Sequence, residues 1–244
     1  MGATARSCFT AGIRVASRSV AWFCIAISAG PAAAAELTGY AVLTSDYVHR
    51  GVTYSDGHIA AQIGGDVEYQ SGFYLGIWGS TIDIENGPSL QREREINYYL
   101  GYTLDISNHW SLGANAVAYV FPGATGSIDY DYEEFSVSAN YRDRAWLEYS
   151  FSPDLYNTGY DTHNIDLLIE WPLPNAFTAG TGVGYYDVSE LTGSGYAYWQ
   201  VGVSRPIGIF DVDLRYHDTN RWVPFVSTED RADSRVSLSI RVHF

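Results

Sequence analysis

The joins between the strand-like segments of this chain alternate between short and long from one end to the other. The short joins span two to four residues and lie at 70–72, 107–108, 142–144, 172–175 and 205–208. The long joins span nine to sixteen residues and lie at 50–59, 85–93, 122–131, 152–162, 187–195 and 218–233. In a transmembrane β-barrel, the turns at one end are short and the loops at the other end are long. The alternation therefore indicates a membrane barrel, because a soluble sandwich has no reason to sort its loops by side.

The segments between these joins alternate apolar and polar side chains, as strands between lipid and a polar lumen require. In the last segment, apolar residues at even positions from Val236 to Phe244 alternate with polar residues at odd positions. Twelve strands are predicted, at about residues 37–49, 60–70, 73–84, 94–106, 109–121, 132–142, 144–152, 162–172, 176–188, 195–205, 209–217 and 234–244. The ninth segment carries Gly180, Gly182 and Gly184 on one side, which predicts a loop or a plug packed close to the wall there.

The predicted fold class is all-β: a single closed antiparallel transmembrane β-barrel of about 12 strands, connected as an up-and-down meander. Closure is expected because an open sheet edge would leave backbone amides unsatisfied in lipid. Ten or fourteen strands are alternatives within this class. A soluble periplasmic sandwich is the alternative outside it, because half-buried strands alternate there too.

The first 35 residues have the pattern of a secretory signal peptide. Three arginines precede an apolar run from Val20 to Ala29, and Ala33 to Ala35 provide a small-residue cleavage site. We therefore expect residues 1–35 to be removed after Sec-type export, and residues 36–244 to form the barrel in a Gram-negative outer membrane. An uncleaved N-terminal anchor is the alternative. Cys8 and Cys24 both lie in this leader, so the mature chain would carry no disulfide.

The mature chain would be strongly acidic, because it keeps all 28 carboxylates and 11 of the 14 basic residues, giving 11 − 28 = −17. Such a chain does not bind nucleic acid through phosphates. The inward faces of the predicted strands supply the candidate pore-lining residues, which are Asp66, Glu68, Glu95, Asp105, Glu134, Glu148, Asp166, Glu170, Asp211, Asp213, Arg215, Arg235 and Arg241. A narrow passage lined mainly by carboxylates would favour cations or zwitterions over anions. The alternative is that these charges pair across the lumen and hold the barrel shut.

The sequence contains no catalytic or metal-binding motif. The six histidines show no metal-ligand spacing, and no nucleophile elbow, zinc motif or glycine-rich phosphate loop is present. One class of outer-membrane barrel hydrolyses phospholipids with a serine and a histidine, but no serine near His217 in the sequence fits such a site. We therefore predict that the chain is not an enzyme and has no cofactor and no metal site.

The segment from Ser45 to Gly57 reads SDYVHRGVTYSDG. It resembles the S-D-Y-x-x-R-G-x-x-x-S-D-G opening of the TorF-type porin family, a bacterial outer-membrane family first described as conserved proteins of unknown function. The resemblance continues through residues 60–62 and 72–80, and it implies an outer-membrane barrel with a pore. The closing aromatic residue, Phe244, resembles the end of the terminal strand of such barrels, where it serves as a signal to the barrel-assembly machinery.

The motif ends the first predicted strand and opens the first long loop. We therefore expect Asp46, Arg50, Ser55, Asp56 and Gly57 at the rim of the barrel. Asp46 and Arg50 would share one face of an extended strand, so an ion pair between them is available to fold the loop against the mouth. A structural role for this pair is favoured over direct contact with a solute, and both remain open.

Taken together, these features favour a passive outer-membrane diffusion channel for small polar solutes, cationic or zwitterionic. Its expected partners are outer-membrane lipid, the solutes and the assembly machinery. The alternative is a closed structural or adhesion barrel that acts through its acidic extracellular loops.

Overall fold

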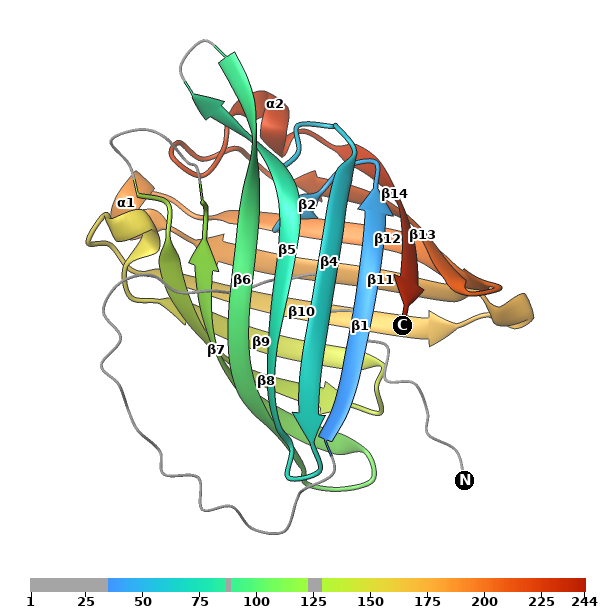
Figure 1. Cartoon of the computed structure of the whole chain (residues 1–244). Coiled ribbons are helices and arrows are strands. Elements are labelled where there is room, and N and C mark those ends of the chain that lie inside the picture. The colour runs from blue at the N-terminus through green and yellow to red at the C-terminus, as the bar shows by residue number, and fades with distance from the viewer. Residues whose placement is uncertain (1–34, 87–88, 123–128) are drawn as a thin grey trace.

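The computed structural model describes residues 35–86, 89–122 and 129–244. Within these residues, twelve antiparallel strands form a closed barrel in which each strand pairs with its neighbours in sequence and β1 pairs with β14 (Figure 1). The barrel strands are β1 (Ala35–Thr44), β4 (Ala60–Tyr69), β5 (Phe73–Asn86), β6 (Ser89–Asp105), β7 (Trp110–Val120), β8 (Tyr132–Tyr141), β9 (Ala145–Ser152), β10 (Thr162–Pro172), β11 (Thr178–Asp187), β12 (Tyr196–Ile207), β13 (Phe210–Thr219) and β14 (Arg235–His243). The predicted closed barrel of about 12 strands is therefore confirmed. None of the described helices is long and apolar enough to cross a membrane.

The outer surface of the barrel is apolar, and the predicted alternation is confirmed along the strands. On β14, for example, Val236, Leu238 and Ile240 are exposed, whereas Ser237, which lies between two of them, is buried inside. The same holds on β6, where Leu100 is 52 % exposed and Asn97 is fully buried. Apolar side chains thus cover the outside of the barrel, and polar side chains face the lumen, as in membrane barrels.

The barrel closes where β1 meets β14. This seam pairs five residues, from Tyr40 with His243 to Thr44 with Ser239, whereas β1 pairs ten residues with β4 on its other side. At the end of the seam, Gly39 and Phe244 exchange two backbone hydrogen bonds. A Cβ at residue 39 would lie 2.7 Å from the Phe244 ring, so the glycine provides the space in which the terminal aromatic ring lies.

Two predicted boundaries are wrong. The first strand ends at Thr44 and not at residue 49, because the chain bends inward at Ser45, whose backbone amide donates to Leu238 of β14. Thr44, Ser45 and Asp46 are three consecutive polar residues, so the apolar alternation breaks at the bend, a signal that the predicted strand to residue 49 passed over. The predicted loop at 85–93 is largely strand, because β5 runs to Asn86 and β6 begins at Ser89, so the two strands continue as a long hairpin.

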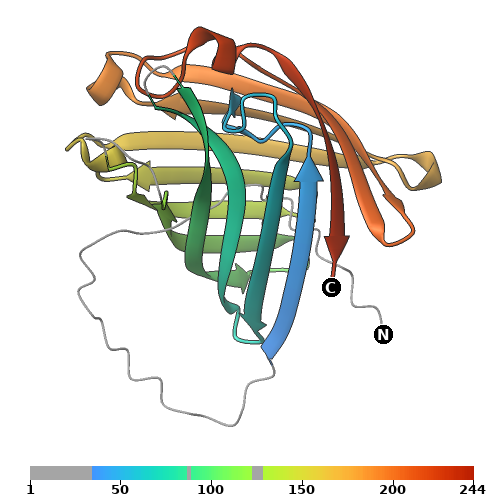
Figure 2. The same ribbon diagram turned by 45° about the horizontal axis from the view of Figure 1, so that its top comes forward.

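The remaining elements are short and lie in the connections. They are the paired strands β2 (Val48–His49) and β3 (Val52–Thr53), the 3-10 turns η1 (Leu155–Asn157) and η2 (Pro174–Ala176), and the helices α1 (Ser189–Thr192) and α2 (Glu229–Ala232). We call residues 45–59, which contain β2 and β3, loop L1. Figure 2 shows that L1 lies within the ring of strands at the end of the barrel where α2 is found. We call this end the long-loop end. The opposite end, where β1 begins at Ala35 and β14 ends at His243, is the short-turn end.

Candidate functional site

L1 is built as a tight hairpin. Val48 pairs with Thr53 and His49 pairs with Val52, which leaves Arg50 and Gly51 as the two turn residues. Both have positive φ, 48° for Arg50 and 80° for Gly51, as a type I′ turn requires. The motif residues Arg-Gly are thus the tip of a hairpin that points into the barrel and not part of the first barrel strand.

The carboxylate of Asp46 organises the base of this hairpin. Its Oδ1 accepts hydrogen bonds from Thr53 Oγ1 at 2.5 Å and from the Gly57 amide at 3.3 Å, and Ser55 Oγ lies 3.0 Å away. Its Oδ2 accepts a hydrogen bond from Arg235 Nη1 of β14 at 3.0 Å. One buried carboxylate therefore joins both arms of L1 to the barrel seam, which explains why the motif combines an aspartate with hydroxyl residues and a glycine.

The tip of the hairpin docks on the opposite wall. Arg50 Nη2 donates to both carboxylate oxygens of Glu134 on β8, at 2.9 and 2.8 Å. The guanidinium carbon of Arg50 also lies 4.6 Å from the centre of the Tyr186 ring on β11. Beside it, a Cβ at Gly51 would come within 2.5 Å of Thr219 Cγ2 and 2.7 Å of Tyr198 Cβ, so only glycine lets the backbone approach the wall this closely.

The charge of Arg50 is held firmly in this buried place. Burial by itself would lower the pKa of Arg50, but the Glu134 carboxylate and the neighbouring tyrosines raise that pKa well above its ordinary value. Burial also raises the pKa of Tyr47 and of Tyr54, two further L1 side chains. L1 therefore carries one fixed positive charge and neutral phenols into the lumen.

The pair predicted between Asp46 and Arg50 is not found, because each side chain has a different partner. Asp46 meets Arg235 and Arg50 meets Glu134. The prediction assumed an extended strand, whereas the hairpin places the two residues at its opposite ends. Of the other predicted rim residues, Ser55 is fully buried in the base of L1, whereas Asp56 and Gly57 are exposed.

A second loop holds L1 from the long-loop side. Arg231 of α2 donates to the Thr53 carbonyl at 3.2 Å and to the Asp83 carbonyl of β5 at 2.9 Å. Arg235 Nη2 also donates to the Asp230 carbonyl at 2.7 Å, which ties α2 to the start of β14. L1 is thus held at its tip by the wall and at its back by the loop between β13 and β14.

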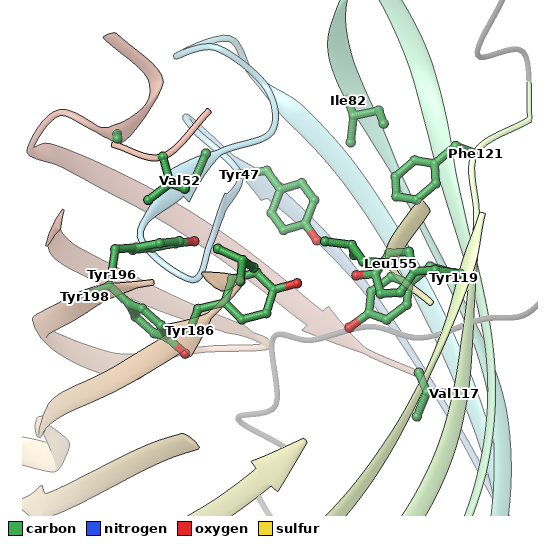
Figure 3. Close-up of a cluster of buried hydrophobic side chains, with 14 of the residues drawn as sticks. Tyr47, Val52, Ile82, Val117, Tyr119, Phe121, Leu155, Tyr186, Tyr196 and Tyr198 are labelled. Atoms are coloured by element: carbon green, nitrogen blue, oxygen red, sulfur yellow. The ribbon is translucent and has the colours of Figure 1, made fainter. Parts of the chain in front are cut away.

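Aromatic side chains pack around L1 and fill the lumen at the long-loop end. Figure 3 shows Tyr47 and Val52 of L1 between tyrosines from the two sides of the barrel. Tyr119 and Tyr196 are each 2 % exposed, and Tyr119 stacks on Tyr132 with ring centres 4.1 Å apart. The long-loop half of the lumen is therefore a packed core in which L1 is the central element.

The short-turn half of the wall is accessible to solvent by contrast. Inward-facing side chains there are half-buried, among them Asp66, Glu148, Asp166, Glu170, Asp211, Asp213 and Arg241. A small hollow in this wall is lined by Trp146, Leu168, Glu170, Gly180 and Arg215, together with Ile169 and Thr181. The lumen thus has a polar, open half and an aromatic half closed by L1.

The predicted pore-lining residues divide between these two halves. Glu95, Glu134 and Arg215 are buried, and Arg235 is bound to L1, whereas Glu68 and Asp105 are exposed at the short-turn end. Several charges are locally paired: Arg215 donates to Asp213 on its own strand at 2.9 and 3.1 Å. Their role as a pore lining stays a prediction.

A loop or a plug was expected against the glycines of β11, but the groups that lie against Gly180, Gly182 and Gly184 are side chains of β10, β12 and β13. The Arg215 guanidinium lies 3.4 Å from the Cβ position of Gly180, and the Tyr198 ring lies against Gly184. From there Tyr198 OH reaches Asp166 Oδ1 at 2.6 Å and Asn164 Oδ1 at 2.9 Å. The glycines therefore let large side chains lie close against the wall.

Sequence reasoning also missed contacts that join distant parts of the chain. His217 Nε2 lies 3.0 Å from Ser237 Oγ, and both side chains are buried inside the barrel. They are 20 residues apart and meet only because β13 pairs with β14. The contacts of Arg231 were missed for the same reason, since no local pattern links α2 to L1.

The fold is a closed antiparallel β-barrel of twelve strands, and solved porin structures have a similar fold. The chain is similar to the NanC porin, with a TM-score of 0.54 and 10 % identity over 86 % of this chain and 99 % of that one. It is also similar to the KdgM porin in complex with disordered oligogalacturonate, with a TM-score of 0.53 and 8 % identity over the same shares. At these identities the likeness shows the fold alone.

Residues 28–244 match the bacterial protein family of unknown function called Gcw_chp, and the chain belongs to this family. No curated protein matches the chain. The family membership covers the whole barrel, including L1 and its docking partners.

Proposed function

We propose that this chain is a passive outer-membrane channel for small polar solutes, with a preference for cations or zwitterions. The observation that carries the proposal is the accessible, carboxylate-rich wall of the short-turn half, where Asp166, Glu170 and their neighbours face a lumen inside an apolar outer surface. A wall of this charge attracts cations and repels anions. Because L1 fills the other half, a solute can cross only where L1 shifts or leaves.

The test is single-channel recording of the refolded barrel in a planar bilayer, with a salt gradient across it. The expected result is steady conductance steps with a reversal potential biased towards cations. In the double variant Asp166→Asn/Glu170→Gln, the reversal potential should shift towards anions, because two accessible carboxylates are neutralised. Glu190→Gln is the matched control, because this exposed carboxylate belongs to α1 in a loop, and its reversal potential should not change. Conductance with an unchanged reversal potential in the double variant would refute the selectivity.

The second candidate is a closed structural or adhesion barrel that acts through its long loops. The docked state of L1 favours it, because buried aromatic and apolar side chains fill the long-loop half of the lumen around L1. A correctly folded barrel that stays silent at all voltages, with L1 docked or removed, would support this candidate over the channel.

The proposed location follows from the fold class. We propose that residues 1–35 are a signal peptide removed on export, that residues 36–244 form the barrel in the outer membrane, and that Phe244 presents the chain to the assembly machinery. Residues 1–34 lie outside the part of the chain that the structure describes. The resemblance to TorF-type porins likewise stays a prediction, because the matching family carries no such description.

A further inference from the structure

The place where Arg50 docks is a complete site formed by the barrel wall. Glu134 comes from β8, Tyr119 from β7 and Tyr186 from β11, and all three are buried, at 2, 2 and 5 % exposure. Tyr119 OH lies 3.4 Å from Glu134 Oε1, the oxygen that also accepts from Arg50. Only the cation itself comes from L1. We call these three wall residues the Glu134 cage.

The chemistry of the cage selects a cation. A carboxylate with both oxygens turned to one group suits a guanidinium or an ammonium, and the face of a tyrosine ring adds a cation–π attraction. In the docked state the Arg50 guanidinium uses both, at 2.8 Å from Glu134 Oε2 and 4.6 Å from the Tyr186 ring centre. One carboxylate balances one positive charge, so the cage fits a monocationic group.

Withdrawal of L1 would leave Glu134 in a buried place without its cation. Removing one partner of a buried ion pair is strongly unfavourable, because the remaining charge is neither paired nor fully hydrated. A cation that binds the vacated cage removes this penalty. Since it binds only when L1 has left, it shifts the population towards the withdrawn state.

We propose that the Glu134 cage is a binding site for the guanidinium or ammonium group of a cationic solute, and that Arg50 occupies it as an internal ligand. In the docked state Arg50 blocks both the site and the lumen. A solute that replaces Arg50 stabilises the withdrawn position of L1. The inference rests on the proposed channel function for its biological meaning, but the binding site itself does not depend on conduction.

The test is chemical rescue of Arg50→Ala by methylguanidinium, which supplies the missing group as a free molecule. The refolded variant in detergent micelles is heated with and without millimolar methylguanidinium, and unfolding is followed by circular dichroism. The expected result is an apparent unfolding temperature raised by about 2 °C or more, since a ligand that binds the folded state stabilises it. Methylurea, which is uncharged and of similar shape, should give no shift. Wild type should give none either, because Arg50 fills its cage.

Two variants test whether the effect belongs to the cage. Arg50→Ala/Glu134→Gln should lose the response to methylguanidinium, because the carboxylate is gone. Arg142→Ala removes an arginine that is stacked 5.2 Å from Tyr141 at an exposed turn, and it should not gain a response. If Arg50→Ala does not fold, Arg50→Gln keeps a polar side chain of intermediate length without the charge and serves in its place.

The outcomes separate this inference from the proposed function. Equal stabilisation of the single and double variants, or no stabilisation of a folded Arg50 variant, would overturn the cage as a binding site, whatever the conductance. Rescue that depends on Glu134 supports the cage even if the barrel proves silent in bilayers, in which case the channel proposal alone fails.

Discussion

Gly51→Ala should undock L1 much more than Gly57→Ala, although both substitutions place a side chain at positive φ. The angles are 80° at Gly51 and 73° at Gly57, so each alanine carries a similar backbone strain of about 1–2 kcal/mol. The surroundings differ, because a Cβ at 51 would lie 2.5 Å from Thr219 Cγ2 and 2.7 Å from Tyr198 Cβ, whereas a Cβ at 57 meets nothing within 4 Å. The overpacking adds about 1–3 kcal/mol at residue 51 only.

This difference corresponds to about a 5- to 150-fold larger loss of docked L1 in Gly51→Ala than in Gly57→Ala. Trypsin reports the undocked fraction, because the Arg50–Gly51 bond is buried when the tip is docked. Cleavage after the exposed arginines, such as Arg142 and Arg221, gives fragments of other masses. When docking is fast compared with cleavage, the cleavage rate follows the population of the open form.

The assay compares the rates of cleavage after Arg50 in lipid vesicles by mass spectrometry, each divided by the rate for the same protein unfolded by heat. Wild type should be cleaved most slowly and Gly51→Ala most rapidly. Equal rates for the two alanine variants would refute the reasoning, because the contacts of the tip with the wall would then contribute nothing to docking.

Two further substitutions test the base and the back of L1. Asp46→Asn removes the charge that binds Arg235 and weakens the hydrogen bond from Thr53. The docked state of L1 should become less stable by about 3 kcal/mol, and tryptic cleavage after Arg50 should accelerate. An unchanged cleavage rate would show that Asp46 does not hold the hairpin. Arg231→Ala removes two donors to backbone carbonyls, so hydrogen exchange at Val52 and Thr53 should become faster by about tenfold, corresponding to about 1.4 kcal/mol. Arg221→Ala, at an exposed position of the same loop, should leave the exchange unchanged.

The barrel could be predicted from the sequence because its two determinants are local. The alternation along residues 236–244 fixes which face meets lipid, and the loop lengths fix the order of the strands. The conformation of L1 could not be predicted, because it depends on contacts across the barrel, such as Arg50 with Glu134, 84 residues apart. The motif pointed to Asp46 and Arg50 as important residues. An ion pair between distant segments leaves no periodic signal in the sequence, so Asp46 was predicted as the partner of Arg50 in place of Glu134.

The extension of β5 and β6 was missed for a related physical reason. Residues 85–93 contain two glutamates, one arginine, a proline and a glycine, which are typical of a loop. A hairpin that continues beyond the barrel is no longer restricted to apolar outward residues, so the membrane pattern ends before the strands do.

L1 also affects the wall of the barrel, because its base lies beside the short seam between β1 and β14. β1 and β14 share only five residue pairs. At the long-loop end of this contact, the Ser45 amide donates to the Leu238 carbonyl, the Leu238 amide donates to Ser45 Oγ, and Asp46 forms an ion pair with Arg235. L1 therefore reinforces the junction between β1 and β14, the first and last strands of the barrel. Withdrawal of L1 would then weaken the pairing of β1 with β14 as well as open the lumen. Substitutions in L1 should therefore affect the closure of the barrel first.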